Sequence, residues 1–187
     1  INCEKRGGLV SHRRLSNGED KPYELNISWW SAMEDPGRDS NRFQYERFLL
    51  TQLLVMSLKG VPAFYLPALL ASENDIKSFS MTGQRRDLNR EKFKSEKLEA
   101  VFKNPESNAN KNLRYLRHAM DVRSQLPQFH PQSQMECLSK NRADIVVIKR
   151  GIGSKAVFII HNMTENKINY RFIDYEFNKL IKNDLNM

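Results

Sequence analysis

Cysteine is scarce in this sequence: its 187 residues include two, Cys3 and Cys137, and these lie far apart. Neither belongs to a C-x-x-C pair, so the chain offers neither a disulfide framework nor a zinc knuckle. Such a sequence is typical of a reducing compartment, and we expect the protein in the cytoplasm.

Long apolar runs are also missing. The longest candidates are interrupted by Arg, Gln, Lys or Pro before they reach the ~20 residues that a membrane-spanning helix needs. The chain opens on Ile1 and shows no basic leader followed by an apolar stretch, so no secretory signal is visible. We therefore expect a soluble protein without a membrane partner.

Basic residues outnumber acidic ones, 30 to 22, which gives a formal net charge of +8. This excess favours contact with phosphates, whether on nucleic acid, on a membrane surface or on a small substrate. Local clusters occur at residues 12–14 and 85–86, but no long Lys/Arg tract and no RRM, zinc-finger or helix-turn-helix signature is present. A basic nucleic-acid-binding module stays an alternative, and its affinity would fall steeply with salt.

Glycine and proline are concentrated in residues 1–38, which predicts an extended loop region there. Asp39 or Ser40 can then cap a helix that continues to about residue 58. Its broad apolar face includes Phe43, Leu50, Leu53, Leu54 and Leu58. Gly60 suits the C-terminal cap because glycine adopts the left-handed conformation without a side-chain clash.

Residues 61–66 form an apolar run without alternation, which predicts a strand covered on both faces, as in a parallel sheet. A short buried helix fits the same periodicity. Residues 67–105 form a long polar segment, with one helix expected at 95–102. Loops of this length are usually functional or disordered, and we favour a functional loop.

A second firm helix is expected at residues 107–126, ended by Pro127. Beyond it, residues 145–148 and 156–160 read as strands joined by a glycine turn at 151–153. The alternating Ile168, Tyr170 and Phe172 predict one more strand, and residues 179–187 are expected to fray. This part predicts an antiparallel β-module.

Residues 82–90 place three arginines, a carboxylate and an amide beside a glycine, in the long polar loop that follows the predicted strand. In α/β barrels, the loops that leave the C-terminal ends of strands bind the ligand. The composition of this segment suits a sugar or a phosphate.

Four motifs follow one another in the order Gly7-Gly8-Leu9-Val10-Ser11, Pro22-Tyr23-Glu24-Leu25-Asn26, Gly60-Val61-Pro62-Ala63-Phe64-Tyr65 and Arg86-Asp87-Leu88-Asn89-Arg90. In this order and spacing the chain resembles sucrose phosphorylase and its relatives, which belong to the α-amylase family, glycoside hydrolase family 13. The resemblance covers roughly residues 7–131.

The resemblance implies an α/β fold: the C-terminal portion of a (β/α)8 TIM barrel in residues 1–131, followed by a small antiparallel β domain in residues 132–187. It implies a retaining double displacement in which α-glucosyl moves from a disaccharide to inorganic phosphate, without a cofactor or metal. The catalytic carboxylates of the family would lie upstream, so no residue of this chain is assigned a catalytic role. We therefore expect no turnover by this chain alone.

The resemblance carries binding residues over to this sequence. Arg86 matches the arginine of the glucosyl subsite, although an Arg86–Asp87 pair that merely stabilises the loop is the alternative. Tyr23 and Glu24 match the mobile loop that lines the acceptor subsite. The sucrose-specific pattern has an aspartate where this chain has Lys21 and a glutamine where it has Glu24.

This departure weakens sucrose as the substrate. With His12, Arg13 and Arg14 in the same region, Lys21 matches an anionic acceptor better, such as glycerate or a sugar phosphate. A hydrolase of the same family and an inactive, truncated remnant stay open, as does the oligomeric state. Trp29 and Trp30 are expected in the core, and His118, His130 and His161 are expected to bind no metal.

Overall fold

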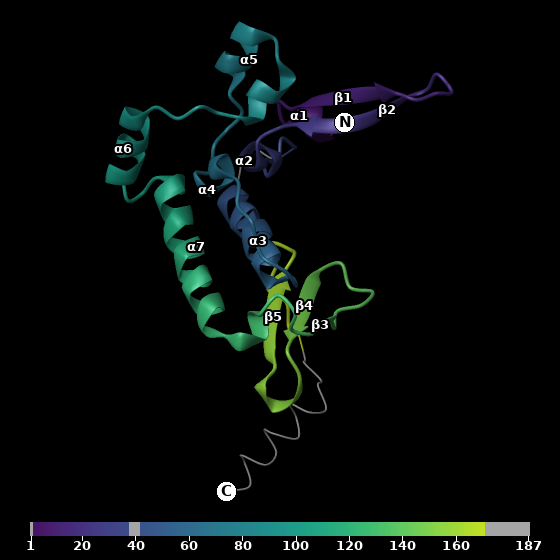
Figure 1. Cartoon of the computed structure of the whole chain (residues 1–187), viewed down its shortest axis with the longest axis vertical. Helices are drawn as coiled ribbons and strands as arrows, with labels where there is room; N and C mark the ends of the chain where they lie inside the picture. Colours follow the sequence, from purple (N-terminus) through teal and green to yellow (C-terminus); the bar gives the residue numbers. More distant parts are fainter. Residues whose placement is uncertain (1, 38–41, 171–187) are drawn as a thin grey trace, which may run out of the picture. The chain divides into compact units, whose positions relative to one another are not determined.

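The structure is a computed structural model that describes residues 2–37 and 42–170. It divides into two compact units (Figure 1). The first unit contains residues 1–51 and 63–117, and the second contains residues 52–62 and 118–187. The predicted boundary at residue 131 separates the barrel portion from the small β domain. It stays a prediction.

The first unit opens with a short helix, α1 (Asn2–Lys5), and an antiparallel hairpin of β1 (Leu9–Arg14) and β2 (Asp20–Asn26). The expected loop over residues 1–38 is therefore wrong for this part. The turn forms because Gly18 takes a positive φ of 87° and the side chain of Asn17 accepts from the Glu19 amide at 3.1 Å. Asn-Gly between two strands is a strong hairpin signal.

A β-bulge interrupts this hairpin. Ser11 pairs with Glu24 and His12 pairs with Pro22, so Tyr23 is the extra residue of β2. Proline, which has no N–H, is tolerated at bulges and edge strands. Because the extra residue shifts the alternation of side chains, Lys21 and Glu24 lie on one face although they are three positions apart.

The core of the first unit gathers around Trp30, Phe48 and Ala71. Trp30 belongs to α2 (Trp29–Ala32), and its ring meets that of Phe48 edge-on at 5.3 Å. The core prediction for Trp30 is confirmed. Its neighbour Trp29 is instead 42% exposed and donates its indole N–H to Thr51.

The predicted long helix is confirmed as α3 (Gln44–Ser57), although the proposed caps Asp39 and Ser40 lie outside the described residues. Gly60 follows it with a φ of 111°, as predicted. The strand predicted at residues 61–66 is wrong. Residues 61–65 belong to no strand, and α4 (Leu66–Leu69) begins where the strand was expected to end.

The exposure of this segment explains the difference. Val61, Tyr65 and Leu66 are 79%, 53% and 52% exposed, so the described residues leave more than half of each side chain uncovered. A strand exists through hydrogen bonds to a neighbour, and both sheets of the described residues are antiparallel ones that do not include this segment. A parallel barrel sheet is therefore not present in the described chain.

The long polar segment contains more structure than predicted. Helix α6 (Ser95–Lys103) confirms the expected helix, but α5 (Ile76–Thr82) and the 3-10 helix η1 (Arg85–Asn89) were missed. Asp75 caps α5 by accepting from the Ser78 amide at 2.9 Å, and Gly83 ends it with a φ of 69°. The second predicted helix is confirmed as α7 (Asn108–Gln125).

The second unit holds a three-stranded antiparallel sheet in the order β3 (Met135–Cys137), β4 (Ile145–Arg150) and β5 (Val157–Asn162). This confirms the antiparallel module, whereas β3 and the 3-10 turns η2 (Pro127–Phe129) and η3 (Gly153–Lys155) were not predicted. Ile168 and Tyr170 lie in no strand. Phe172 and residues 179–187 lie outside the described residues.

Two arginines of this unit contact the end of α3. Arg150, which is fully buried, donates to the carbonyls of Ser57 at 3.2 Å and Leu58 at 2.6 Å. Arg123 donates to the Gly60 carbonyl at 2.8 Å. The last carbonyls of a helix lack partners within the helix, and positive charge near them is favourable. Burial lowers the pKa of both guanidinium groups.

Candidate functional site

The structure brings two of the predicted binding residues together from distant parts of the chain. Arg86 of η1 donates from Nε to both carboxylate oxygens of Glu24 in β2, at 3.1 and 3.3 Å, across 62 residues. The two side chains are 55% and 31% exposed, so solvent screens the ion pair and its contribution to stability is small. The contact therefore says more about the position of Arg86 than about stability.

The alternative of a loop-stabilising ion pair requires Asp87 to bind Arg86, but Asp87 is hydrogen-bonded to Thr82. Its carboxylate accepts from the Thr82 hydroxyl at 2.7 Å, and the same hydroxyl oxygen accepts from the Gln84 amide at 3.1 Å. These bonds fix the turn from α5 into η1. Leu88 is the buried residue of η1, with a side chain that is 2% exposed. Asp87 thus shapes the loop, while Arg86 is directed to the hairpin.

The residue before Arg86 also contacts the hairpin. Arg85 donates from Nη1 to the carbonyl of Val10 in β1 at 2.6 Å. Arg85 belongs to the arginine-rich segment 82–90, but the sequence predicts no individual role for it. A sequence offers no signal for this contact, because its acceptor is a backbone carbonyl 75 residues away.

Asp75 links η1 to the preceding helix. Its backbone amide donates to the Leu88 carbonyl at 2.7 Å, and its side chain caps α5. Burial tends to raise the pKa of this carboxyl, but hydrogen bonds from the Ser78 hydroxyl and amide outweigh it and lower the pKa. Asp75 is therefore ionised and structural at neutral pH.

Tyr23 and Lys21 lie on the hairpin, exposed to solvent. Tyr23 is 64% exposed at the bulge. Lys21 lies directly opposite Arg13, and neither side chain forms an ion pair within the part of the chain that the structure describes. Like charges directly opposite each other destabilise a hairpin. An anion bound at this pair would remove the repulsion.

The predicted site is open in the described residues. A cavity of about 480 Å³ in the first unit is lined by residues 70–77 and by parts of residues 91–109. A second one of about 400 Å³ is lined by Trp29, Tyr65 and Asn89 among others. Neither is lined by Arg86 or Tyr23. An enclosed sugar pocket at Arg86 would need walls that residues 2–37 and 42–170 do not supply.

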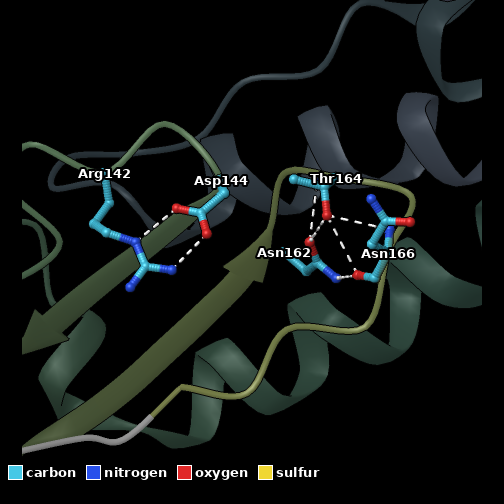
Figure 2. A network of polar contacts seen from close by, with 5 residues as sticks. All are labelled: Arg142, Asp144, Asn162, Thr164 and Asn166. Atoms are coloured by element: carbon cyan, nitrogen blue, oxygen red, sulfur yellow. Dashed lines mark hydrogen bonds and ion pairs between the residues drawn. The ribbon is translucent and has the colours of Figure 1, made fainter.

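A polar network in the second unit holds a turn and not a ligand site (Figure 2). Thr164 and Asn162 are bonded through Oγ1 and Oδ1 at 2.9 Å, and the Asn162 amide donates to the Asn166 carbonyl at 2.7 Å. Arg142 and Asp144 form a separate ion pair beside it, with Nε 2.7 Å from Oδ1. The hydrogen bonds of Asn162, Thr164 and Asn166 thus close the turn after β5.

His161 is buried, as expected of a structural histidine. Its Nε2 lies 2.8 Å from the Ser57 hydroxyl, which is also 2.8 Å from the Leu53 carbonyl. The hydroxyl donates its one hydrogen to the carbonyl, so Nε2–H donates to the hydroxyl. Burial lowers the pKa of His161, which keeps the ring neutral.

The described residues contain neither a metal-binding cluster nor a membrane-spanning helix. Within residues 2–37 and 42–170, no three or more His, Cys, Asp or Glu side chains are grouped so that they could hold a metal ion. In the same residues, no helix has the length and apolar character needed to cross a membrane.

Known proteins similar to this chain are phosphorylases. No protein-family model matches the chain. Glucosylglycerate phosphorylase of Allomeiothermus silvanus is 34% identical over 162 residues, which cover 86% of this chain and 29% of that protein. Sucrose phosphorylase of Streptococcus mutans is 26% identical over 125 residues, covering 67% of this chain and 23% of the relative.

The chain shares its fold with part of a solved phosphorylase structure. The crystal structure of sucrose 6F-phosphate phosphorylase from Thermoanaerobacter thermosaccharolyticum matches with a TM-score of 0.65 and 18% identity, over 87% of this chain and 30% of that one. The chain thus spans less than a third of the length of these relatives. It is a homologue of the sucrose phosphorylase-like glycoside phosphorylases over that portion, as its motifs indicate.

Proposed function

We propose that this chain is part of a retaining glycoside phosphorylase that transfers an α-glucosyl group from a disaccharide to phosphate and gives α-glucose 1-phosphate. The contact between Arg86 and Glu24 carries this proposal, because it joins the two binding motifs that the homologous stretch contains. In the parent enzyme, residues 1–131 belong to the barrel and residues 132–187 form the small β domain.

Arg86 binds the glucosyl unit in this proposal. A guanidinium group is planar and offers its N–H donors in a fixed fork, which suits sugar hydroxyls and carboxylates. Without a ligand it is held by Glu24, and the exposure of both side chains makes this pair easy to exchange. Asp87 supports Arg86 indirectly by fixing η1 through Thr82.

Tyr23 lines the acceptor side. Bulges redirect side chains beside active sites, and the bulge in β2 occurs at Tyr23 itself. An exposed aromatic ring at this position can pack on a sugar face. Glu24 then stands next to the acceptor hydroxyls when Arg86 has turned to the glucosyl unit.

The acceptor is anionic in this proposal: it is glycerate or a sugar phosphate, and each of these carries negative charge. Arg13 and Lys21 face each other without a carboxylate partner in the described residues, so a bound anion would offset their repulsion. Of the two relatives described above, the one with 34% identity is named glucosylglycerate phosphorylase.

Catalysis requires residues outside this chain. A retaining enzyme places two carboxyl groups about 5 Å apart. Glu24 and Asp87 are instead bonded to Arg86 and Thr82.

The test is an assay of the parent enzyme with inorganic phosphate and each of glucosylglycerate, sucrose and sucrose 6′-phosphate. We expect α-glucose 1-phosphate, with the anionic acceptors preferred, and about 100-fold lower kcat/KM in Arg86→Lys, because a lysine cannot reproduce the fork. Equal preference for sucrose would contradict the proposal that the acceptor is anionic. Release of glucose that does not depend on phosphate would show that the parent enzyme is a hydrolase and not a phosphorylase.

A further inference from the structure

Two consecutive arginines of η1 contact the two strands of the hairpin separately. Arg85 donates to the Val10 carbonyl of β1, and Arg86 pairs with Glu24 of β2. One short 3-10 helix therefore holds both strands of the segment that presents Tyr23.

The two contacts differ in chemistry. Glu24 is a flexible carboxylate that a ligand at Arg86 must displace. The Val10 carbonyl belongs to the backbone, does not ionise and has no side-chain freedom. A ligand that takes Arg86 would leave the bond between Arg85 and Val10 intact, at a length of 2.6 Å.

Other anchors of the hairpin lie at its ends. The Asn74 amide donates to the carbonyls of Arg6 and Gly7, both at 3.2 Å, and its oxygen accepts from the Ser28 amide at 2.7 Å. Val10 lies further along β1, opposite Leu25. Leu25 is two positions from Tyr23, so the Arg85 contact acts beside the bulge.

We infer that Arg85 is a positioning residue, which holds the β1–β2 hairpin against η1 while Arg86 exchanges Glu24 for the ligand. Arg85 touches no substrate; it keeps Tyr23 at a constant position relative to Arg86. This inference rests on the proposed function, in which Arg86 and Tyr23 bind the two sugar units.

Hydrogen exchange of this chain tests the contact itself. Arg85→Met should speed amide exchange of residues 9–14 and 20–26 at least about fivefold, because local opening becomes easier. Residues 145–150 and 157–162 serve as an internal reference. The matched control is Arg117→Met, an exposed arginine on α7 outside the proposed site. Hairpin exchange equal in the two variants would overturn the inference.

Kinetics of the parent enzyme separate positioning from simple stabilisation. Arg85→Met should raise KM for the disaccharide about tenfold with kcat within about twofold, since it weakens ground-state and transition-state binding alike. Arg85→Lys should lie between Arg85→Met and wild type. An unchanged KM would leave Arg85 a merely structural residue and overturn the inference. A wild-type parent that transfers no glucosyl group would refute the proposed function, and hairpin exchange would then decide the Arg85 contact alone.

Discussion

The ion pair between Glu24 and Arg86 contributes little to stability, and in the proposed function it bears on substrate specificity. Their ion pair is partly solvated, so its loss costs well under about 1 kcal/mol. In the proposed function, the same carboxylate decides which guanidinium donors are available to a ligand. At the scale of single residues, the proposed preference for an anionic acceptor therefore depends on Glu24 and Lys21.

Replacing Glu24 by Gln tests this difference. The amide keeps the shape of the side chain but loses the charge that holds Arg86, so the guanidinium becomes free for a neutral sugar. In the parent enzyme we expect the ratio of kcat/KM for sucrose to that for glucosylglycerate to rise about fivefold, roughly 1 kcal/mol. The unfolding midpoint of the variant should match wild type, and a ratio that stays constant would contradict the role of Glu24.

Helix α3 depends on the β-module of the second unit for the end of its hydrogen-bond ladder. Its last carbonyls accept from Arg150 of β4 and from Arg123 of α7, and both guanidinium groups lie over the Phe129 ring, at 5.3 and 4.9 Å. Cations over an aromatic face are attracted to it. At the scale of elements, a helix end and a strand thus stabilise each other.

Arg150→Met should destabilise the second unit by about 2–4 kcal/mol, because the buried carbonyl of Ser57 and the partly buried carbonyl of Leu58 lose their donor. Urea unfolding followed by circular dichroism measures the change. Arg150→Lys should recover part of it. Lys140→Met, at an exposed position, is the matched control and should change stability by less than about 0.5 kcal/mol.

Acidification should weaken the contact between β5 and the end of α3. Burial lowers the pKa of His161 below its unfolded value of about 6.5, so the neutral ring is favoured in the folded state. Its contribution is complete above about pH 6.5 and is lost as the pH falls toward the lower, folded pKa.

The measurement compares urea unfolding at about pH 7.5 and about pH 5.5 in wild type and in His161→Gln, which can still bond Ser57 but cannot titrate. We expect wild type to lose about 1 kcal/mol more than the variant on acidification. Equal losses in the two proteins would exclude His161 as the group that titrates.

Several apolar side chains in residues 61–66, which follow α3 along the chain, are exposed to solvent. Val61 is 79% exposed and Tyr65 53%. Exposed apolar clusters of this kind mark interaction or aggregation sites. At the scale of the whole molecule, the relative with 34% identity is more than three times as long as the portion that matches this chain.

Val61→Lys should reduce self-association of the chain without lowering its unfolding midpoint, because Val61 loses no buried contact. Sedimentation velocity over a range of concentrations measures the effect. Ile152→Lys, at a position of the same unit whose side chain is 67% exposed, is the control and should leave association unchanged. Equal effects of the two substitutions would show that any added charge suffices.

The sequence by itself determined the elements that depend on nearby residues. Periodicity and caps predicted α3, α6, α7 and the hairpin of β4 and β5, and the motif around Arg86 indicated the family. The tertiary structure decided whether residues 61–66 form a strand, and whether Arg86 pairs with Asp87 or with Glu24. A helix satisfies its hydrogen bonds within itself, whereas a strand or an exposed ion pair depends on partners that the chain brings from far away.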